Sequence, residues 1–192
     1  MLSNIFKIEQ IKYDDNSANE YGRDWTYKGS VNPKAIVFPS SKEQIKELIS
    51  FANKDNEKIV PSGGRTGLSW GAVATQNEIV VSMEKLNSIT NVDNEEKSLI
   101  CQAGAITQNI QNAAQQQNLL YPVNFASSGS SHIGGNVATN AGGAKVIKYG
   151  STRNWVSSLS VITGNGTELH LNKGLKKNNS AYDLRNLFIG SE

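Results

Sequence analysis

The sequence predicts a mixed α+β fold of two lobes, a small α/β lobe followed by a mainly antiparallel α+β lobe. In the first half, short apolar runs alternate with one amphipathic helix pattern, which is typical of strand–helix–strand units. In the second half, alternating apolar runs are joined by turn residues, which is typical of β-hairpins. The pattern changes near residue 92, so we expect one lobe at about 31–92 and a second at about 93–192, preceded by an N-terminal extension at 1–30.

Three strands and one helix are predicted in the first lobe. Residues 31–41 contain a short apolar run closed by a proline, which predicts a strand. Ser41 is expected to cap the helix that follows, with Gln44 completing a capping box. Residues 58–61 and 78–83 are two further apolar runs and are predicted to be strands. The side chains that recur at helical spacing should face the core, namely Ile45, Leu48, Ile49 and Ala52.

Two hairpins and one helix are predicted in the second lobe. The runs SITNVD and SLICQAG flank the turn NEEK at 94–97, which predicts a hairpin. Residues 107–119 have a helical pattern, and Thr107 is the expected cap. Residues 158–171, SLSVITGNGTELHL, are two alternating runs joined by a turn that contains Asn165–Gly166, the clearest hairpin signal in the chain.

Composition and charge limit the function classes. The chain has 192 residues with a formal net charge of +2, a balance that does not indicate a nucleic-acid partner. Cys101 is the single cysteine and only two histidines are present, so we expect neither a disulfide nor a metal site. Burial makes Cys101 an inert thiol in this interpretation. No apolar run approaches the roughly 18 residues of a membrane span, and the N-terminus has no targeting pattern. We therefore expect a cytoplasmic protein, or one lying peripherally at a membrane.

The distribution of glycine indicates where the chemistry lies. The 17 glycines gather at 63–71, 129–143 and 164–166. Residues 61–72, PSGGRTGLSWGA, follow a predicted buried strand, and consecutive backbone N–H groups in such a turn can converge on an anion. The segment matches neither the Walker A nor the Rossmann pattern. Taken alone, it is equally compatible with a tight turn that binds nothing.

A second glycine-rich segment favours a ligand. Residues 127–143, SSGSSHIGGNVATNAGG, offer hydroxyl groups, amides and bare backbone in what reads as a loop. A glycine-rich corner between strands is the alternative. Two such segments in one chain predict an extended, doubly phosphorylated cofactor between two lobes.

Four stretches together resemble a known family. PSGGRTGLSWGA, IGGNVATNAGG, KYGSTRNWVSSLSVITGNG and YDLRNLFIGSE, in this order, are similar to the FAD-binding domain of the vanillyl-alcohol-oxidase or PCMH-type flavoproteins. The similarity is greatest to the group that contains bacterial glycolate oxidase, D-lactate dehydrogenase and D-2-hydroxyglutarate dehydrogenase. It runs from about residue 21 to the end, and it implies a two-lobed domain with FAD between the lobes.

The resemblance also implies a set of cofactor-binding residues. Those around the pyrophosphate would be Pro61, Ser62, Gly63, Gly64, Arg65, Thr66, Gly67 and Leu68. Those along the ribityl chain and the isoalloxazine would be Gly134, Gly135, Asn136, Thr139, Asn140 and Gly143, with Ser128, Ser130, Ser131 and His132 close by and Ile162 near the adenine. The implied reaction is hydride transfer from a D-2-hydroxy acid of the lactate, glycolate or 2-hydroxyglutarate type to flavin N5. The electron acceptor is not specified.

Three residues depart from the family pattern. Arg65 stands where the family has a third glycine and where some relatives carry a histidine bonded to flavin, so the resemblance implies noncovalent FAD. Arg65 is expected either to pair with a phosphate or to lie on the surface of a loop tip. Trp70 either packs under the loop or crowds it. His132 replaces a common threonine.

The chain ends at LFIGSE, where the family continues into a further strand and a substrate domain. By resemblance that part carries the catalytic groups, so we assign no catalytic residue here and expect a domain truncated at its C-terminus. Two hypotheses are open: the FAD-binding portion of a 2-hydroxy-acid dehydrogenase or oxidase, and a non-catalytic FAD-binding module or remnant that needs a partner chain. A reductase of the cell-wall nucleotide pathway shares the fold, but the GGNVATNAGG stretch argues against it.

Overall fold

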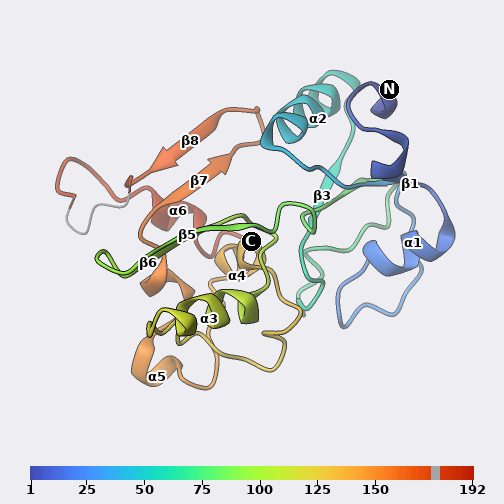
Figure 1. Cartoon of the computed structure of the whole chain (residues 1–192). Coiled ribbons are helices and arrows are strands. Elements are labelled where there is room, and N and C mark those ends of the chain that lie inside the picture. Colours follow the sequence, from blue (N-terminus) through green and yellow to red (C-terminus); the bar gives the residue numbers. More distant parts are fainter. Residues whose placement is uncertain (174–177) are drawn as a thin grey trace.

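The computed structural model describes residues 1–173 and 178–192 (Figure 1). Its first half contains a four-stranded sheet with the order β1-β2-β4-β3, and its second half contains two separate two-stranded sheets. The expected succession of an α/β part and a mainly antiparallel α+β part is therefore confirmed. The division into lobes near residue 92 stays a prediction.

The four-stranded sheet is mixed. β1 (Ile11–Lys12) lies antiparallel to β2 (Ala35–Val37), whereas β2, β4 (Ile79–Ser82) and β3 (Ile59–Ser62) are parallel to one another. β2 and β4 are buried throughout. This explains why both read as continuous apolar runs rather than as alternating ones. β3 is an edge strand, and its carboxyl end leads directly into the first glycine-rich segment.

Each face of this sheet packs against a helix. α2 (Lys42–Asp55) contributes Leu48 to a core that includes Val37 and Val81. α1 (Asp15–Tyr21) contributes Tyr21 to a second core, where its ring meets Phe38 edge to face at 5.0 Å. The sheet is thus fixed on both sides, which gives the loop after β3 a rigid base.

The start of α2 differs slightly from the prediction. The Ser41 hydroxyl accepts a hydrogen bond from the Gln44 backbone N–H at 3.3 Å, so Ser41 is the N-cap as expected. The reciprocal bond of the predicted capping box is wrong by one residue, because Gln44 Oε1 accepts from the backbone N–H of Ser40 at 2.9 Å. Gln44 also donates to the Ile5 carbonyl at 3.1 Å, which ties the start of the chain to α2.

Residues 1–30 contribute to the first core. They contain two 3-10 turns, η1 (Leu2–Asn4) and η2 (Ile8–Gln10), before β1 and α1. Leu2 and Phe6 are buried against the α2 side of the sheet. The segment described as an extension is thus packed as an integral part of the sheet layer.

The second half begins with the predicted hairpin of β5 (Ile89–Asp93) and β6 (Ser98–Cys101). α3 (Thr107–Gln116) follows. The prediction that Thr107 caps this helix is wrong, because Ile106 is the N-cap and Thr107 is a fully buried first residue. Its hydroxyl is engaged by the second glycine-rich segment instead, as described below.

The remaining elements are short. They are α4 (Ile133–Ala138), α5 (Val146–Tyr149), η3 (Thr152–Trp155), β7 (Leu159–Ile162), β8 (Glu168–Leu171) and α6 (Arg185–Phe188). β7 and β8 form the predicted hairpin, with Gly166 at φ +83° in its turn. Figure 1 shows this hairpin beside α2. Glu168 accepts hydrogen bonds from Lys42 and Lys46 of α2 at 2.9 and 2.5 Å, which joins the two halves of the molecule.

Candidate functional site

The first glycine-rich segment, residues 63–71, leaves β3 with its backbone N–H groups free. None of the N–H groups of residues 63–69 donates a hydrogen bond to any residue that the structure describes. The run ends at Trp70, whose N–H donates to Asp24 Oδ2 at 2.8 Å. Consecutive unpaired N–H groups in a turn can converge on an anion. Without a ligand, these N–H groups can form hydrogen bonds only with water, and only while they are exposed to it.

The second segment, residues 127–143, is not the loop that its composition predicted. It starts as a turn and then forms α4 at Ile133–Ala138. Two of its N–H groups are bonded to the α3 side, from Ile133 to the Ala105 carbonyl at 2.9 Å and from Gly134 to the Ala103 carbonyl at 2.8 Å. These bonds offset the poor helix propensity of the glycine pair, which is why propensity alone gave the wrong assignment.

The two segments meet backbone to backbone. A Cβ atom at Gly64 would lie 2.0 Å from the Ser130 carbonyl oxygen and 2.9 Å from the Ser131 Cα. A Cβ atom at Gly63 would lie 3.5 Å from the His132 Cβ, an ordinary contact. Gly64 is therefore required by the approach of the second segment and not by a ligand.

The other glycines of the site fall into two kinds. At Gly134 and Gly143 an added Cβ would meet protein, at 2.8 Å from the Ala103 Cβ and at 2.0 Å from the Asn124 carbonyl oxygen. At Gly67 and Gly135 it would meet no atom of the described residues within 4 Å. Contacts within the protein therefore do not explain these two glycines, and an added side chain at either position would point into open space.

His132 lies at the junction of the two segments. It is 9% exposed, and its Nδ1 atom is buried with no hydrogen-bond partner among the described residues. Burial lowers the pKa of this imidazole and the nearby Arg65 cation lowers it further, while Glu84 acts in the opposite direction. A buried, unpaired ring nitrogen is costly, and a polar ligand atom would satisfy it.

Arg65 is packed and not on the surface of a loop tip, so that interpretation is wrong. Its guanidinium lies 4.4 Å from the centroid of the Tyr21 ring, a cation–π contact, and its Nη2 lies 3.6 Å from Glu20 Oε1. Its backbone is left-handed at φ +56°. The pairing of Arg65 with a phosphate stays a prediction.

Trp70 neither packs under the loop nor crowds it. Its side chain is 60% exposed, and its ring meets that of Tyr27 edge to face at 5.4 Å. Its backbone is also left-handed, at φ +66°, which is unusual for a bulky residue. The ring therefore lies beside the segment, on the side of residues 24–27.

Several predicted site residues have protein partners and support the site. Thr107 Oγ1 lies 2.7 Å from Ser131 Oγ and accepts a hydrogen bond from Asn136 Nδ2 at 2.6 Å. Asn140 Oδ1 accepts from the Ser151 hydroxyl at 2.9 Å and from the Arg153 N–H at 3.0 Å. Other assigned residues with a protein contact of their own are Ser62, bonded to the Tyr21 carbonyl, Ser128, bonded to the Gln108 N–H, and Thr139, bonded to the Gly135 carbonyl.

The other assigned residues are placed more simply. Pro61 is an exposed residue of β3, Thr66 and Leu68 belong to the open run, and Ser130 contacts Gly64 as described. Ile162 lies in β7, and the hairpin contacts described above run to α2. The two glycine-rich segments are thus brought together as expected, whereas no contact of Ile162 with either of them is seen among the described residues.

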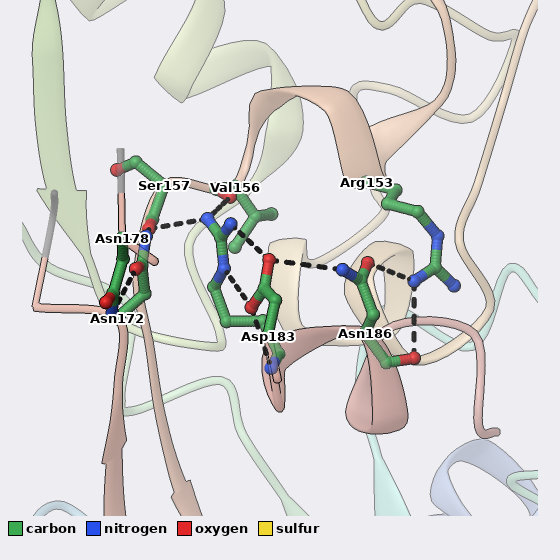
Figure 2. A network of polar contacts seen from close by, with 8 residues as sticks. Arg153, Val156, Ser157, Asn172, Asn178, Asp183 and Asn186 are labelled. Atoms are coloured by element: carbon green, nitrogen blue, oxygen red, sulfur yellow. Dashed lines mark hydrogen bonds and ion pairs between the residues drawn. The ribbon is translucent and has the colours of Figure 1, made fainter. Parts of the chain in front are cut away.

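A polar network links η3 and the residues that follow it to the start of α6 (Figure 2). Arg185 forms an ion pair with Asp183 and also donates to the carbonyl groups of Val156 and Ser157 at 2.6 Å each. Arg153 donates to Asn186 Oδ1 at 2.5 Å. Beyond this network, the N–H groups of residues 190 and 192 donate to carbonyl groups of α4, which fixes the end of that helix.

Two residues that hold the glycine-rich segments in place were missed by the sequence analysis, Thr107 and Asp24. Asp24 is 4% exposed, although it lies in a polar stretch. An aspartate two residues before a threonine is a recognisable turn signal, but its bond to Trp70 joins positions far apart in the sequence. Thr107 carried only a cap signal, which concealed its role as the centre of a buried network.

Other site types are not found in the described residues. They contain no group of three side chains that could hold a metal ion. None of their helices is long and apolar enough to cross a bilayer. Burial raises the pKa of the Cys101 thiol to about 11, in agreement with the prediction of an inert cysteine.

Comparison with known proteins gives the same picture. A model of the family described as FAD binding domain matches residues 33–172. A D-2-hydroxyglutarate dehydrogenase of Stutzerimonas stutzeri (strain A1501) is 49% identical over 191 residues, covering 100% of this chain and 41% of that protein. The mitochondrial D-2-hydroxyglutarate dehydrogenase of Arabidopsis thaliana is 36% identical over 188 residues, covering 98% and 34%. The chain thus spans well under half of the length of these curated relatives.

Solved structures confirm the fold. An alkyldihydroxyacetonephosphate synthase superposes with a TM-score of 0.87 at 23% identity, covering 99% of this chain and 36% of that one. The 6-hydoxy-D-nicotine oxidase from Arthrobacter nicotinovorans superposes with a TM-score of 0.73 at 17% identity, covering 83% and 35%. At such identities the likeness shows the fold and nothing of the reaction.

Proposed function

The chain belongs to the FAD binding domain family, and from this premise we propose that it is the FAD-binding part of an enzyme that oxidises a D-2-hydroxy acid. Relatives named D-2-hydroxyglutarate dehydrogenase support this substrate class. Glycolate and lactate belong to the same class and are the substrates to compare. The electron acceptor is not assigned.

One observation carries the proposal. The free N–H groups of residues 63–69 lie on a segment that packs against the second glycine-rich segment, where Gly135 opens to unfilled space. A dinucleotide needs both features, because its pyrophosphate needs donors and its flat ring system needs bare backbone. The residues present therefore fit FAD.

We assign the binding roles as follows. The N–H groups of residues 63–69 would hold the pyrophosphate through charge-assisted hydrogen bonds, each worth roughly 1.5–3 kcal/mol. His132 would offer its unpaired Nδ1 to a polar atom of the cofactor. Gly135 would allow close approach of the ribityl chain or the ring. The remaining cofactor contacts are those assigned by resemblance, and binding would be noncovalent.

Bound flavin would supply the acceptor of the hydride that leaves the α-carbon of the hydroxy acid. The part of this chain in that chemistry would be to bind and orient the cofactor and to exclude water from its buried edge. None of its residues is proposed as a catalytic acid or base. We further propose that residues 31–192 form the FAD-binding domain and that the protein acts in the cytoplasm.

The proposal is tested by adding FAD to the purified chain and following the quenching of flavin fluorescence. Gly135→Val should abolish binding, because the branched side chain would fill the open space, while the circular dichroism of the helices is unchanged. Gly164→Val is the matched control, since Gly164 is equally open but lies in the β7–β8 turn. Flavin binding retained by Gly135→Val would refute this placement of the cofactor.

The substrate class needs the protein that contains this chain. Anaerobic addition of D-2-hydroxyglutarate, D-lactate or glycolate should bleach the visible absorption of the bound flavin. L-2-Hydroxyglutarate and L-lactate are the controls, since glycolate has no enantiomer. If flavin is bound but no D-2-hydroxy acid reduces it, the binding proposal stands and the substrate class is wrong.

A further inference from the structure

Residues 24–27, which follow α1, form hydrogen bonds with the last residues of the first glycine-rich segment, residues 67–70. Asp24 Oδ1 accepts hydrogen bonds from the N–H groups of Thr26 and Tyr27 at 3.0 and 2.9 Å, while Oδ2 accepts from the N–H of Trp70 at 2.8 Å. The carboxylate thus closes its own turn and reaches across to a residue 46 positions away. With 4% exposure, it is among the most buried charged side chains described.

Residues 24–27 bind backbone carbonyl groups of the first glycine-rich segment and leave its N–H groups before Trp70 unbonded. Two carbonyl groups of the segment accept hydrogen bonds from residues 24–27. The Trp25 N–H donates to the Gly67 carbonyl at 3.2 Å, and the Thr26 hydroxyl donates to the Leu68 carbonyl at 3.5 Å. Among the described residues, no N–H group of the segment before Trp70 donates to residues 24–27. The N–H groups of residues 63–69 are left available.

The contact also holds an unfavourable backbone conformation. Trp70 has φ +66°, a left-handed conformation that a bulky residue rarely adopts without a compensating interaction. Its N–H bond to Asp24 and the edge-to-face packing of its ring on Tyr27 are those interactions. Without the carboxylate, nothing else in the described residues binds the Trp70 N–H.

The carboxylate is suited to this role because it is ionised at neutral pH. Burial raises the pKa of Asp24, but the hydrogen bonds from the backbone of Tyr27, Trp70 and Thr26 outweigh it, so that the pKa lies below its usual value. Hydrogen bonds to a charged acceptor are roughly twice as strong as neutral ones.

We propose that Asp24 is a positioning residue for the cofactor: its buried carboxylate fixes residues 67–70 so that the N–H groups of 63–69 stay preorganised for the pyrophosphate. This inference rests on the proposed function, but Asp24 is not among the residues assigned to contact FAD. Its contribution is to reduce the ordering that the segment must undergo on binding.

The test uses the whole chain and three variants. Asp24→Asn keeps the shape of the side chain but places an amide NH₂ group against one of the backbone N–H donors. Asp14→Asn is the matched control, because Asp14 caps α1 through the Ser17 N–H and hydroxyl, away from the glycine-rich segment. Thr26→Ala is a milder variant that removes only the hydroxyl bonds to Asp24 and Leu68.

Two readouts are compared at a temperature where every variant is folded by circular dichroism. The dissociation constant of FAD should rise by about tenfold or more in Asp24→Asn, the loss expected for one hydrogen bond to a charged group, and should be unchanged in Asp14→Asn. Without FAD, amide hydrogen exchange should accelerate in Asp24→Asn at Thr26, Tyr27 and Trp70, whose N–H groups the carboxylate binds, and at Val73, whose N–H donates to the Trp70 carbonyl, and should stay as it was elsewhere. A merely structural role would spread the acceleration through the core.

The outcomes separate the two proposals. If Asp24→Asn binds FAD as tightly as the unchanged chain, the positioning role is refuted while the FAD-binding proposal stands. If the unchanged chain binds no FAD, the FAD-binding proposal fails for this chain, and exchange at Trp70 still decides whether Asp24 holds the segment. Should Asp24→Asn not fold, Thr26→Ala decides, with weaker binding and faster Trp70 exchange in support, and unchanged values against.

Discussion

The two glycine-rich segments have similar compositions and opposite backbone bonding. Residues 63–69 donate no backbone hydrogen bond to the described protein, whereas the second segment contains a short helix whose first N–H groups are bonded to the α3 side. The first segment is held mainly from its far end, by Asp24, and the second from beneath, by Thr107. Glycine therefore serves two purposes in these segments. In residues 63–69 it accompanies backbone N–H donors that remain unbonded, and at Gly64 and Gly134 it allows two backbone segments to come into contact.

The largest expected effect is that of Gly64→Ala. The new Cβ would lie 2.0 Å from the Ser130 carbonyl oxygen, and backbone on both sides would have to move. We expect a loss of about 3 kcal/mol in the free energy of unfolding, at the upper end of the cost of overpacking. Urea denaturation of the flavin-free chain measures it.

Gly67→Ala is the matched variant for this prediction. Gly67 lies in the same segment, but its Cβ would meet open space. We expect its stability to change by less than about 0.5 kcal/mol, as for other exposed substitutions. Equal costs for Gly64→Ala and Gly67→Ala would show that the two segments do not touch as described.

A smaller effect is expected from Thr107→Val. Valine matches the shape of threonine but removes the hydroxyl that accepts from Asn136 Nδ2 and contacts Ser131. Because the Asn136 amide is buried, losing its acceptor should cost about 2 kcal/mol in the free energy of unfolding. Thr107→Ser, which keeps the hydroxyl, should retain most of that stability. A similar loss in both variants would assign the effect to the methyl group.

Hydrogen exchange sharpens the comparison without any substitution. In the flavin-free chain, the amides of residues 63–69 should exchange at least about tenfold faster than those of Ile133 and Gly134, which are hydrogen-bonded. Adding FAD should slow the first group and leave the second nearly unchanged. Equal protection of both segments in the flavin-free chain would remove the distinction on which the site rests.

Local sequence patterns were enough to predict much of the fold. The strands β2 to β8 and α2 were predicted because apolar spacing and a capping serine act within a few residues, and Ser41 caps α2 as expected. β1 was not predicted. The hairpin at Asn165–Gly166 was predicted because its turn needs a left-handed glycine, and Gly166 has φ +83°.

The rest depends on contacts between distant residues. α4 was missed because its glycines have poor helix propensity, and the acceptors that stabilise it, the Ala103 and Ala105 carbonyl groups, belong to another segment. The pairing of Asp24 with Trp70 was invisible for the same reason. The resemblance named two segments that the structure brings into contact, but it could not say which of their glycines meet protein and which meet open space.

The smallest expected effect concerns His132, the residue where both segments meet. Burial, and then the Arg65 cation, lower the pKa of its imidazole in the folded chain below the ordinary value of 6.5. Below pH 6.5 the unfolded chain therefore binds the proton more readily, and folding stability should fall as the pH drops from 6.5 through the folded-state pKa. Glu84, which acts in the opposite direction, limits the size of this loss.

Urea denaturation of the flavin-free chain at a series of pH values measures this loss. His132→Gln should flatten the fall in stability below pH 6.5, because glutamine does not titrate. His170→Gln is the control, since His170 lies on β8 with an exposed side chain, outside the junction. If His132→Gln keeps the same acid-side fall, the imidazole is not enclosed between the two segments.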